Sequence, residues 1–150
     1  MTLKLIGVDG QAEGVTVVAQ FNPKEVTVDK SVHWSQLSAD PSAVAFTGCG
    51  PTTMAFELMF DGFETGTSVQ PHITMLHQLS DIDATLKRPP RVRVVSGAPR
   101  AVGVIPAFDG VIETLTVKYV MFNDSGVAVR ATVAVKLREA GTIKIGAPQP

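Results

Sequence analysis

The sequence predicts a mainly β domain with one helix, built as an antiparallel barrel or sandwich of a single core. Three observations predict it. Residues 112–137 alternate between apolar and other side chains and are interrupted once by a tight-turn sequence, shorter alternating segments precede them, and only residues 68–82 show helical spacing. Because 150 residues suffice for one ordinary core, we expect one β domain over residues 1–140 and an extended tail over residues 141–150.

The hairpin of residues 112–137 is the element around which the others are placed. Its second strand carries apolar side chains on one face, at Val127, Val129, Ala131, Val133, Val135 and Leu137. Its first strand alternates in the same way, with Leu115, Val117, Tyr119 and Met121 on one side. The sequence Asn123-Asp124-Ser125-Gly126 suits a short hairpin loop, since Gly126 supplies a positive φ.

The first half of the chain predicts an opening hairpin and then a change of direction. Residues 3–8 and 15–21 alternate as two short strands, and Pro23 interrupts pairing before alternation resumes at Val26. Residues 32–44 contain Trp34 and Pro41 in an irregular pattern, which indicates a long loop or an exposed excursion. The glycine-rich residues 46–51 predict a turn.

The second half predicts an interior strand, a helix and a short strand before the hairpin. Residues 53–60 alternate strictly and end at Asp61-Gly62. The helix is expected to begin at Ser68 as its N-cap, with Pro71 in its first turn, and to run to about Ile82. Residues 91–95 form the next strand, and residues 97–106 a turn or short edge strand.

Composition excludes several classes of partner. With 45% hydrophobic residues, 18% charged residues and a net charge of −1, the chain lacks the basic excess that attracts nucleic acid or acidic membranes. No apolar run approaches the roughly 18 residues that span a bilayer. Cys49 is the single cysteine, and the N-terminus lacks a signal-peptide pattern, so a protein folded in the cytoplasm is expected.

The residues able to carry catalysis do not form a recognisable arrangement. The histidines are His33, His72 and His77, and the last two lie about 140° apart on a helix, which does not suit a shared metal ion. Cys49 lies between glycines without an identifiable base. Asp61 and Asp109 each lie in a Phe-Asp-Gly sequence, which is ordinary turn chemistry, although Glu57, Glu64 or Glu113 could complete an acid/base pair. We expect no enzyme, metal or cofactor.

The one basic run contains Lys87, Arg88 and Arg91 around two prolines, with Arg93 following. Aromatic side chains do not interleave with it, as a nucleic-acid stacking surface would require. A solvated loop, or a contact with an acidic neighbouring subunit, is the better interpretation.

Three short motifs, in this order and spacing, resemble the tube proteins of contractile injection systems. They are Phe21-Asn22-Pro23, Phe46-Thr47-Gly48-Cys49 and the segment of residues 124–131 that ends in Arg130-Ala131. The match covers about residues 16–139 and is most similar to the adaptor that joins the inner tube to the spike in extracellular phage-tail-like particles. Cys49 replaces the family's usual glycine, and the chain ends before the LysM-type module that commonly follows in adaptors.

The resemblance implies a non-catalytic β subunit of a homohexameric ring, whose sheets continue around the ring. The implied partners are further copies of the chain, the inner tube protein, a VgrG-like spike protein and baseplate components, without nucleic acid or membrane insertion. Assembly would take place in the bacterial cytoplasm, before the ring becomes part of an intracellular or released particle. Whether the chain is an adaptor, a tube initiator or a plain tube subunit stays open.

The expected contacts between subunits fall on two segments, with these candidates: Trp34, Gln36, Leu37, Lys87, Arg88 and Arg91. Trp34 is either an anchor for a neighbour or a side chain folded onto its own core. A different alternative is a monomeric β-barrel module that binds carbohydrate or peptide, although one Trp and one Tyr offer little for sugar stacking.

Overall fold

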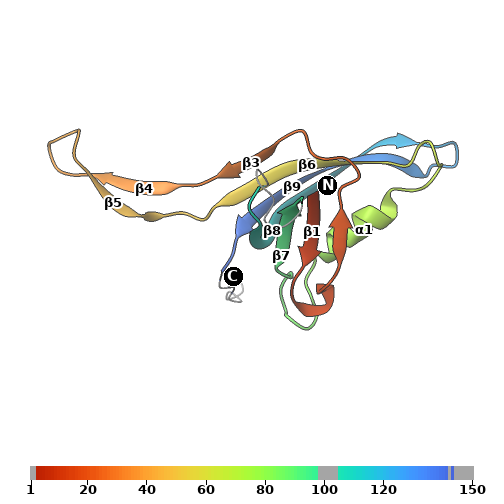
Figure 1. The fold of residues 1–150 in the computed structure, drawn as a ribbon, viewed down its shortest axis with the longest axis horizontal. Helices are drawn as coiled ribbons and strands as arrows, with labels where there is room; N and C mark the ends of the chain where they lie inside the picture. The colour runs from red at the N-terminus through yellow and green to blue at the C-terminus, as the bar shows by residue number, and fades with distance from the viewer. Residues whose placement is uncertain (1–2, 98–104, 142, 144–150) are drawn as a thin grey trace, which may run out of the picture.

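The computed structural model describes residues 3–97, 105–141 and 143, which form nine strands and one α-helix (Figure 1). The strands are β1 (Leu3–Gly7), β2 (Thr16–Val18), β3 (Val26–Asp29), β4 (Val32–Gln36), β5 (Val44–Cys49), β6 (Thr53–Asp61), β7 (Val92–Ser96), β8 (Phe108–Phe122) and β9 (Ala128–Glu139), and the helix is α1 (Gln70–Gln78). A 3-10 turn, η1 (Gly10–Ala12), lies between β1 and β2.

Seven strands form one antiparallel sheet in the order β2-β1-β7-β8-β9-β6-β3, and β4 pairs with β5 in a second sheet. The prediction of a mainly β domain with one helix is confirmed. Among the described residues the large sheet does not close into a barrel, because β2 and β3 remain its two edges. The fold is therefore an open, sandwich-like form, with α1 covering part of one face.

The hairpin predicted for residues 112–137 is confirmed as β8 and β9. Gly126 has a φ of +81°, and its amide donates to the Asn123 carbonyl across the turn. The Asn123 side chain also accepts hydrogen bonds from the amides of Ser125 and Val127. Val127 was expected on the buried face, but it precedes β9 and is exposed because it belongs to the turn.

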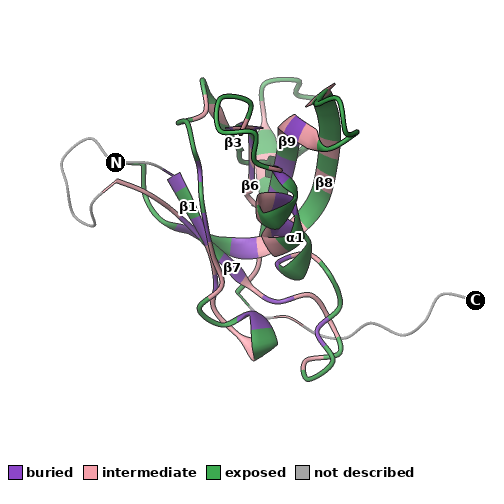
Figure 2. Ribbon diagram, turned by 90° about the vertical axis from the view of Figure 1, so that its right-hand side faces the viewer, coloured by how far each residue is buried: buried purple, intermediate pink, exposed green. Residues whose placement is uncertain are grey.

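The core lies against the central strands and the helix. Even-numbered residues of β6 and odd-numbered residues of β9 are buried on one face, and Val69, Ile73, Leu76 and Leu79 cover them from the α1 segment. In Figure 2 the buried residues gather where β1, β7, β6 and β9 approach α1. This interior position of β6, between β9 and β3, confirms the prediction for residues 53–60.

The helix is shorter than predicted at both ends. Its N-cap residue is Val69, and the Ser68 hydroxyl accepts a hydrogen bond from the Gln70 amide just before the helix. The helix ends at Gln78, where the Ser80 hydroxyl donates to the carbonyls of Leu76 and His77 and takes the place of further helical amides. Ile82 is consequently outside the helix and exposed.

The loop expected at residues 32–44 and the turn expected at residues 46–51 were wrong in detail, because they form the paired strands β4 and β5. Trp34 pairs with Phe46 and Gln36 with Val44 across this ribbon. Figure 1 shows it projecting from the end of the large sheet, so the expectation of an exposed excursion is confirmed. The ribbon continues the β3–β6 hairpin outward.

Three smaller differences complete the comparison. The strand expected at residues 15–21 is limited to β2, and Phe21 is exposed beyond it. Asp109 lies inside β8 rather than in a turn, because Arg93 of β7 pairs with it in the sheet. The expectations for residues 98–104 and for most of the tail, at residues 142 and 144–150, lie outside the described residues.

Candidate functional site

The most distinctive surface of the molecule is the projecting ribbon of β4 and β5 with its connecting turn, residues 32–49, hereafter the arm. Every residue of β4 is exposed, and β5 is exposed or only partly buried. At roughly 3.3 Å per residue, the arm extends on the order of 25 Å past the end of β3. A two-stranded ribbon without a covering layer is at best marginally stable in water, so the arm is suited to packing against another surface.

One face of the arm is apolar. Trp34 and Phe46 lie opposite each other with ring centroids 5.5 Å apart in an edge-to-face arrangement, yet they are 58% and 57% exposed. Val32 and Val44 extend this patch along the two strands, and both are exposed. The alternative that Trp34 folds onto its own core is therefore wrong. Its ring lies against the arm's own Phe46 and is not part of the core.

The tip of the arm is an ordered turn. One oxygen of the Asp40 carboxylate accepts hydrogen bonds from the amide and hydroxyl of Ser42, at 2.9 and 2.7 Å. These bonds hold the pKa of Asp40 below its usual value. The Leu37 amide donates to the Ala43 carbonyl and closes the turn. The arm therefore presents Gln36 and Leu37 in a defined geometry, and both are exposed.

Besides the outer edge of β2, the large sheet leaves two edges without a partner strand among the described residues. One is β3, which pairs with β6 only. The other lies along β8, because β7 pairs with residues 108–110 of this strand while β8 continues to Phe122. Exposed strand edges of this length are sites where another chain can add a strand.

The basic run behaves differently from the arm, because most of its charge is used within the chain. The Arg88 guanidinium donates to Asp9 at 3.0 Å, and one Arg91 nitrogen donates to the Gly141 carbonyl at 2.6 Å. The Asp9 carboxylate also accepts the Arg91 amide at 2.7 Å. Lys87 is exposed, whereas Arg88 and Arg91 are partly buried. The structure thus brings Arg88 and Arg91 together at the β1–β7 side and places the arm candidates elsewhere.

Two hollows mark the body of the molecule. An open groove of about 910 Å³ lies on the sheet face opposite the core, between the Phe21–Glu25 segment and the outward residues of β6, β8 and β9. A polar cleft of about 440 Å³ lies between the end of β6 and the start of α1, where Asp61, Glu64 and His72 line it.

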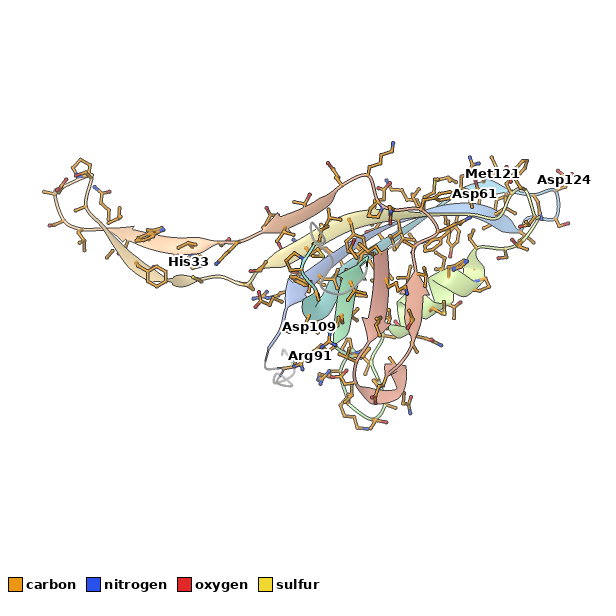
Figure 3. All side chains as sticks on the ribbon, viewed as in Figure 1. His33, Asp61, Arg91, Asp109, Met121 and Asp124 are labelled. Carbon is orange, nitrogen blue, oxygen red and sulfur yellow. The ribbon has the colours of Figure 1, made fainter. Side chains whose placement is uncertain are left out.

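Asp61 and Asp109, the two aspartates considered for catalysis, are each paired with an arginine. Asp61 pairs with Arg130 at 2.9 Å, and Asp109 pairs with Arg93 at 2.7 Å. The Phe63 amide and the Arg130 guanidinium keep the pKa of Asp61 below its usual value despite partial burial. A carboxylate that stays ionised in this way is a poor general acid. Figure 3 shows Asp61 and Asp109 at separate places, so they do not form a pair.

The remaining candidates for catalysis or metal binding do not lie close together either. His33 lies on the arm, far from Asp61 and Asp109 (Figure 3), and His72 stacks on Phe60 at 4.7 Å. Cys49 is exposed on β5. Within residues 3–97, 105–141 and 143, no three His, Cys, Asp or Glu side chains are placed to hold a metal ion. Nor does any helix there reach the length and apolarity needed to cross a membrane.

The functional feature that sequence reasoning missed is the regular ribbon of the arm. Its signal was present at Val32 and Trp34 on one strand and Val44 and Phe46 on the other, which are apolar residues at two-residue spacing. The polar residue Gln36 and the glycines of residues 48–50 obscured the pattern.

The three family-like motifs take structural roles at the ends of the body and in the arm. The Asn22 side chain accepts the Leu3 amide at 3.3 Å and fixes the turn after β2. Phe46-Thr47-Gly48-Cys49 forms most of β5, and Arg130 ties β9 to the end of β6. A scan against family models matches residues 5–144 to the contractile injection system tube protein. A search of curated proteins finds no match. Because this model spans nearly the whole chain, the protein belongs to the family of contractile injection system tube proteins.

Proposed function

We propose that this protein is a structural ring component of a contractile injection system, which joins the inner tube to the spike and the baseplate hub and performs no catalysis. Family membership supports a tube-type structural role. The observation that carries the proposal further is the arm, an ordered and apolar-faced ribbon that the chain itself does not cover.

Two of the free edges of the sheet support a ring. An edge at β3 and an edge at β8 lie on opposite sides of the same antiparallel sheet. A contact between two different surfaces of identical chains repeats from copy to copy, and it closes into a ring when the rotation permits. The number six comes from the resemblance and is part of the proposal.

The proposed contacts between subunits are the arm residues Trp34, Gln36 and Leu37, together with Lys87. All four are exposed. In this proposal Arg88 and Arg91 contribute indirectly. Their side-chain bonds to Asp9 and Gly141 hold in place the segment that carries Lys87. Trp34 is the proposed anchor, since large aromatic side chains dominate the energetics of interfaces.

The second candidate is a plain inner-tube subunit that polymerises, and the family match favours it directly. A module that binds carbohydrate has less support. Trp34 lies on the arm, while the Tyr119 hydroxyl donates to Gln70 at the other end of the sheet, so Trp34 and Tyr119 form no shared stacking platform.

Light scattering followed by negative-stain microscopy of the purified protein tests the proposal. Single rings that cap a preformed inner tube and bind a spike protein are expected of the adaptor. Extended tubes formed by this protein alone would identify the plain tube subunit. A monomer that joins no ring, even when mixed with inner tube and spike proteins, would contradict both.

A further inference from the structure

The polar cleft of about 440 Å³ lies at the end of the molecule away from the arm. It is formed between the end of β6 and the start of α1. Figure 3 shows Asp61, which lines it, at the opposite end from His33 of the arm. Its volume falls within the range of about 300 to 1,000 Å³ that is usual for ligand pockets. The cleft is therefore a separate surface from the arm and is large enough to hold a side chain of a binding partner.

Residues 62–67, which form one wall of the cleft, make an ordered turn. The Thr67 amide donates to the Gly62 carbonyl at 3.0 Å, and the Gly66 amide donates to the Phe63 carbonyl at 3.2 Å. Gly66 has a φ of +66°, and a Cβ atom at Gly62 would collide with the Thr67 carbonyl oxygen. Glycine suits both positions because it has no Cβ atom. The chain's own bonds therefore hold this wall in place without a ligand.

The lining of the cleft is acidic. Asp61 and Glu64 line it, and no lysine or arginine is among the described residues that do. Each Asp61 carboxylate oxygen already has a donor, the Phe63 amide at 2.9 Å on one and Arg130 at 2.9 Å on the other. Glu64 is exposed and has no hydrogen bond or ion pair with any other described residue. Glu64 therefore offers the cleft an unpaired carboxylate.

The backbone amides at the start of α1 are already used, so they are not available to an anion. The Val69 amide donates to the Ala128 carbonyl. The Gln70 amide donates to the Ser68 hydroxyl, and Pro71 has no amide proton. The amides of the next two residues donate back to the Val69 carbonyl, at 3.1 and 3.3 Å. With these donors occupied and two carboxylates in the lining, the cleft favours a cation over an anion.

The cleft also has apolar surface. Phe21 lines it and is 47% exposed, and Val69 contributes a buried aliphatic side chain. The His72 ring stacks on Phe60, and its Nδ1 atom is buried without a hydrogen-bond partner among the described residues. A long basic side chain has a matching composition, because its methylene stem packs on apolar groups while its charged head pairs with a carboxylate. The face of an aromatic ring such as Phe21 also attracts a cation.

We propose that this cleft binds the basic side chain, a lysine or an arginine, of a partner protein in the particle. The ammonium or guanidinium group pairs with Glu64, and the methylene stem lies against Phe21. The Ser68 hydroxyl accepts the Gln70 amide and keeps its own proton to donate to a peptide carbonyl of the partner. This inference rests on the proposed function, because it adds a contact between the ring and a neighbouring protein.

Saturation-transfer NMR tests the site, because it observes a small probe and works on monomers and multimers alike. The probes are N-acetyl-lysine N-methylamide and the norleucine analogue, which has a similar stem without the charge. The lysine probe is expected to bind at least about threefold more tightly than the norleucine probe, since only its ammonium group pairs with Glu64. Equal dissociation constants for the two probes would overturn the proposal.

A matched pair of variants assigns the binding to the cleft. Glu64→Gln removes the unpaired carboxylate, whereas Glu13→Gln removes an exposed carboxylate outside the cleft. Glu64→Gln is expected to weaken binding of the lysine probe by about three- to fivefold, and Glu13→Gln by less than about 1.5-fold. Equal effects of the two substitutions would show that the probe responds to net charge rather than to the cleft.

A third probe, n-butylamine, separates a partner's side chain from a free amine. It carries the same ammonium group and stem without the peptide groups. Because it lacks the hydrogen bonds that those groups form, it is expected to bind at least about threefold more weakly than the lysine probe. Equal affinities would assign the cleft to free amines and overturn the proposal.

Probe binding is measured separately from assembly, so the two failures are distinguishable. Rings that form although the lysine probe does not bind would overturn this inference and leave the proposed function intact. Probe binding that depends on Glu64, in a protein that joins no ring even with tube and spike proteins, would remove the proposed function and with it the role of the cleft in the particle.

Discussion

The arm and strand β6 follow each other in one long hairpin, yet they differ sharply in how far their apolar side chains are buried. In β6, Met54, Phe56, Leu58 and Phe60 alternate inward and are buried against β9 and α1. In the arm, Val32 and Trp34 on β4, and Val44 and Phe46 on β5, have the same two-residue spacing. Trp34 and Phe46 nevertheless remain more than half exposed. The local pattern is similar in both halves, and what differs is whether the chain supplies a second layer.

This difference separates the residues that stabilise the fold from those that, in our proposal, join the copies. The body has its covering layer in β1, β7 and α1, so its apolar residues stabilise the monomer. The arm has none, so its apolar residues contribute little until another molecule covers them. Substitutions in the two halves should consequently affect different measurements.

The largest expected effect on monomer stability comes from Leu58→Ala in β6. Leu58 is fully buried, and removing its side chain leaves a cavity under α1. The free energy of unfolding should fall by about 2 to 5 kcal/mol in urea denaturation. Val44→Ala, in an exposed part of the arm, is the control. A similar loss in both variants would mean that the arm belongs to the monomer's core.

A smaller effect on stability, with a large one on assembly, is expected for Trp34→Ala. Its ring lies against Phe46 and outside the core, so the free energy of unfolding of the monomer should change by about 0.5 to 1.5 kcal/mol. An interface anchor of this kind is worth about 2 kcal/mol or more, or roughly thirtyfold in the dissociation constant. Sedimentation over a concentration series measures the second quantity. Unchanged assembly would exclude Trp34 as the anchor.

We expect part of the loss of fold stability at acidic pH to arise from Asp83, which lies in the body. Asp83 is buried, and its carboxylate accepts the amides of Gln11, Thr85 and Leu86 at 2.6, 2.8 and 3.2 Å. Burial alone would raise the pKa of Asp83, but these donors outweigh it and hold the pKa below its usual value.

Because the pKa is lowered in the folded state, Asp83 stabilises the fold above its unfolded-state pKa, and this contribution is lost as the pH falls through the folded-state value. Asp83→Asn should therefore lower the urea midpoint at neutral pH, and the difference from the parent should narrow at about pH 3. An unchanged difference across this range would show that the charge is not the cause.

The smallest perturbation uses no substitution at all. Trp34 is the only tryptophan of the chain and lies on the arm, so its fluorescence reports on the arm alone. Its emission maximum should move to shorter wavelength as the protein is concentrated into assemblies, because the ring becomes covered. A constant emission maximum through assembly would contradict a buried arm.

The sequence predicted the parts of the molecule that the chain buries by itself. The strict alternation in residues 127–137 and 53–60 reflects one solvent-exposed and one buried face, and both strands were located correctly. The helix was predicted, but its first residue was not. Whether Ser68 or Val69 is the N-cap depends on local hydrogen bonds to the first amides of the helix, and composition does not determine these.

The arm was harder to predict for a physical reason. Its strands are stabilised by pairing between Trp34 and Phe46 and, in our proposal, by a second copy, so its sequence does not show the burial pattern of a single chain. Likewise, the use of Arg88 and Arg91 by Asp9 and Gly141 depends on segments about 50 to 80 residues apart in sequence, and such contacts are visible only in the folded structure.

The most direct test of the arm's role is a comparison of mass in solution. Residues 32–49 are replaced by a short Gly-Ser turn that joins β3 to β6, and the variant is measured beside the intact protein by light scattering, with circular dichroism as the check on folding. We expect multimers for the intact protein and a folded β monomer for the variant. Multimers of equal mass and concentration dependence for both proteins would contradict it.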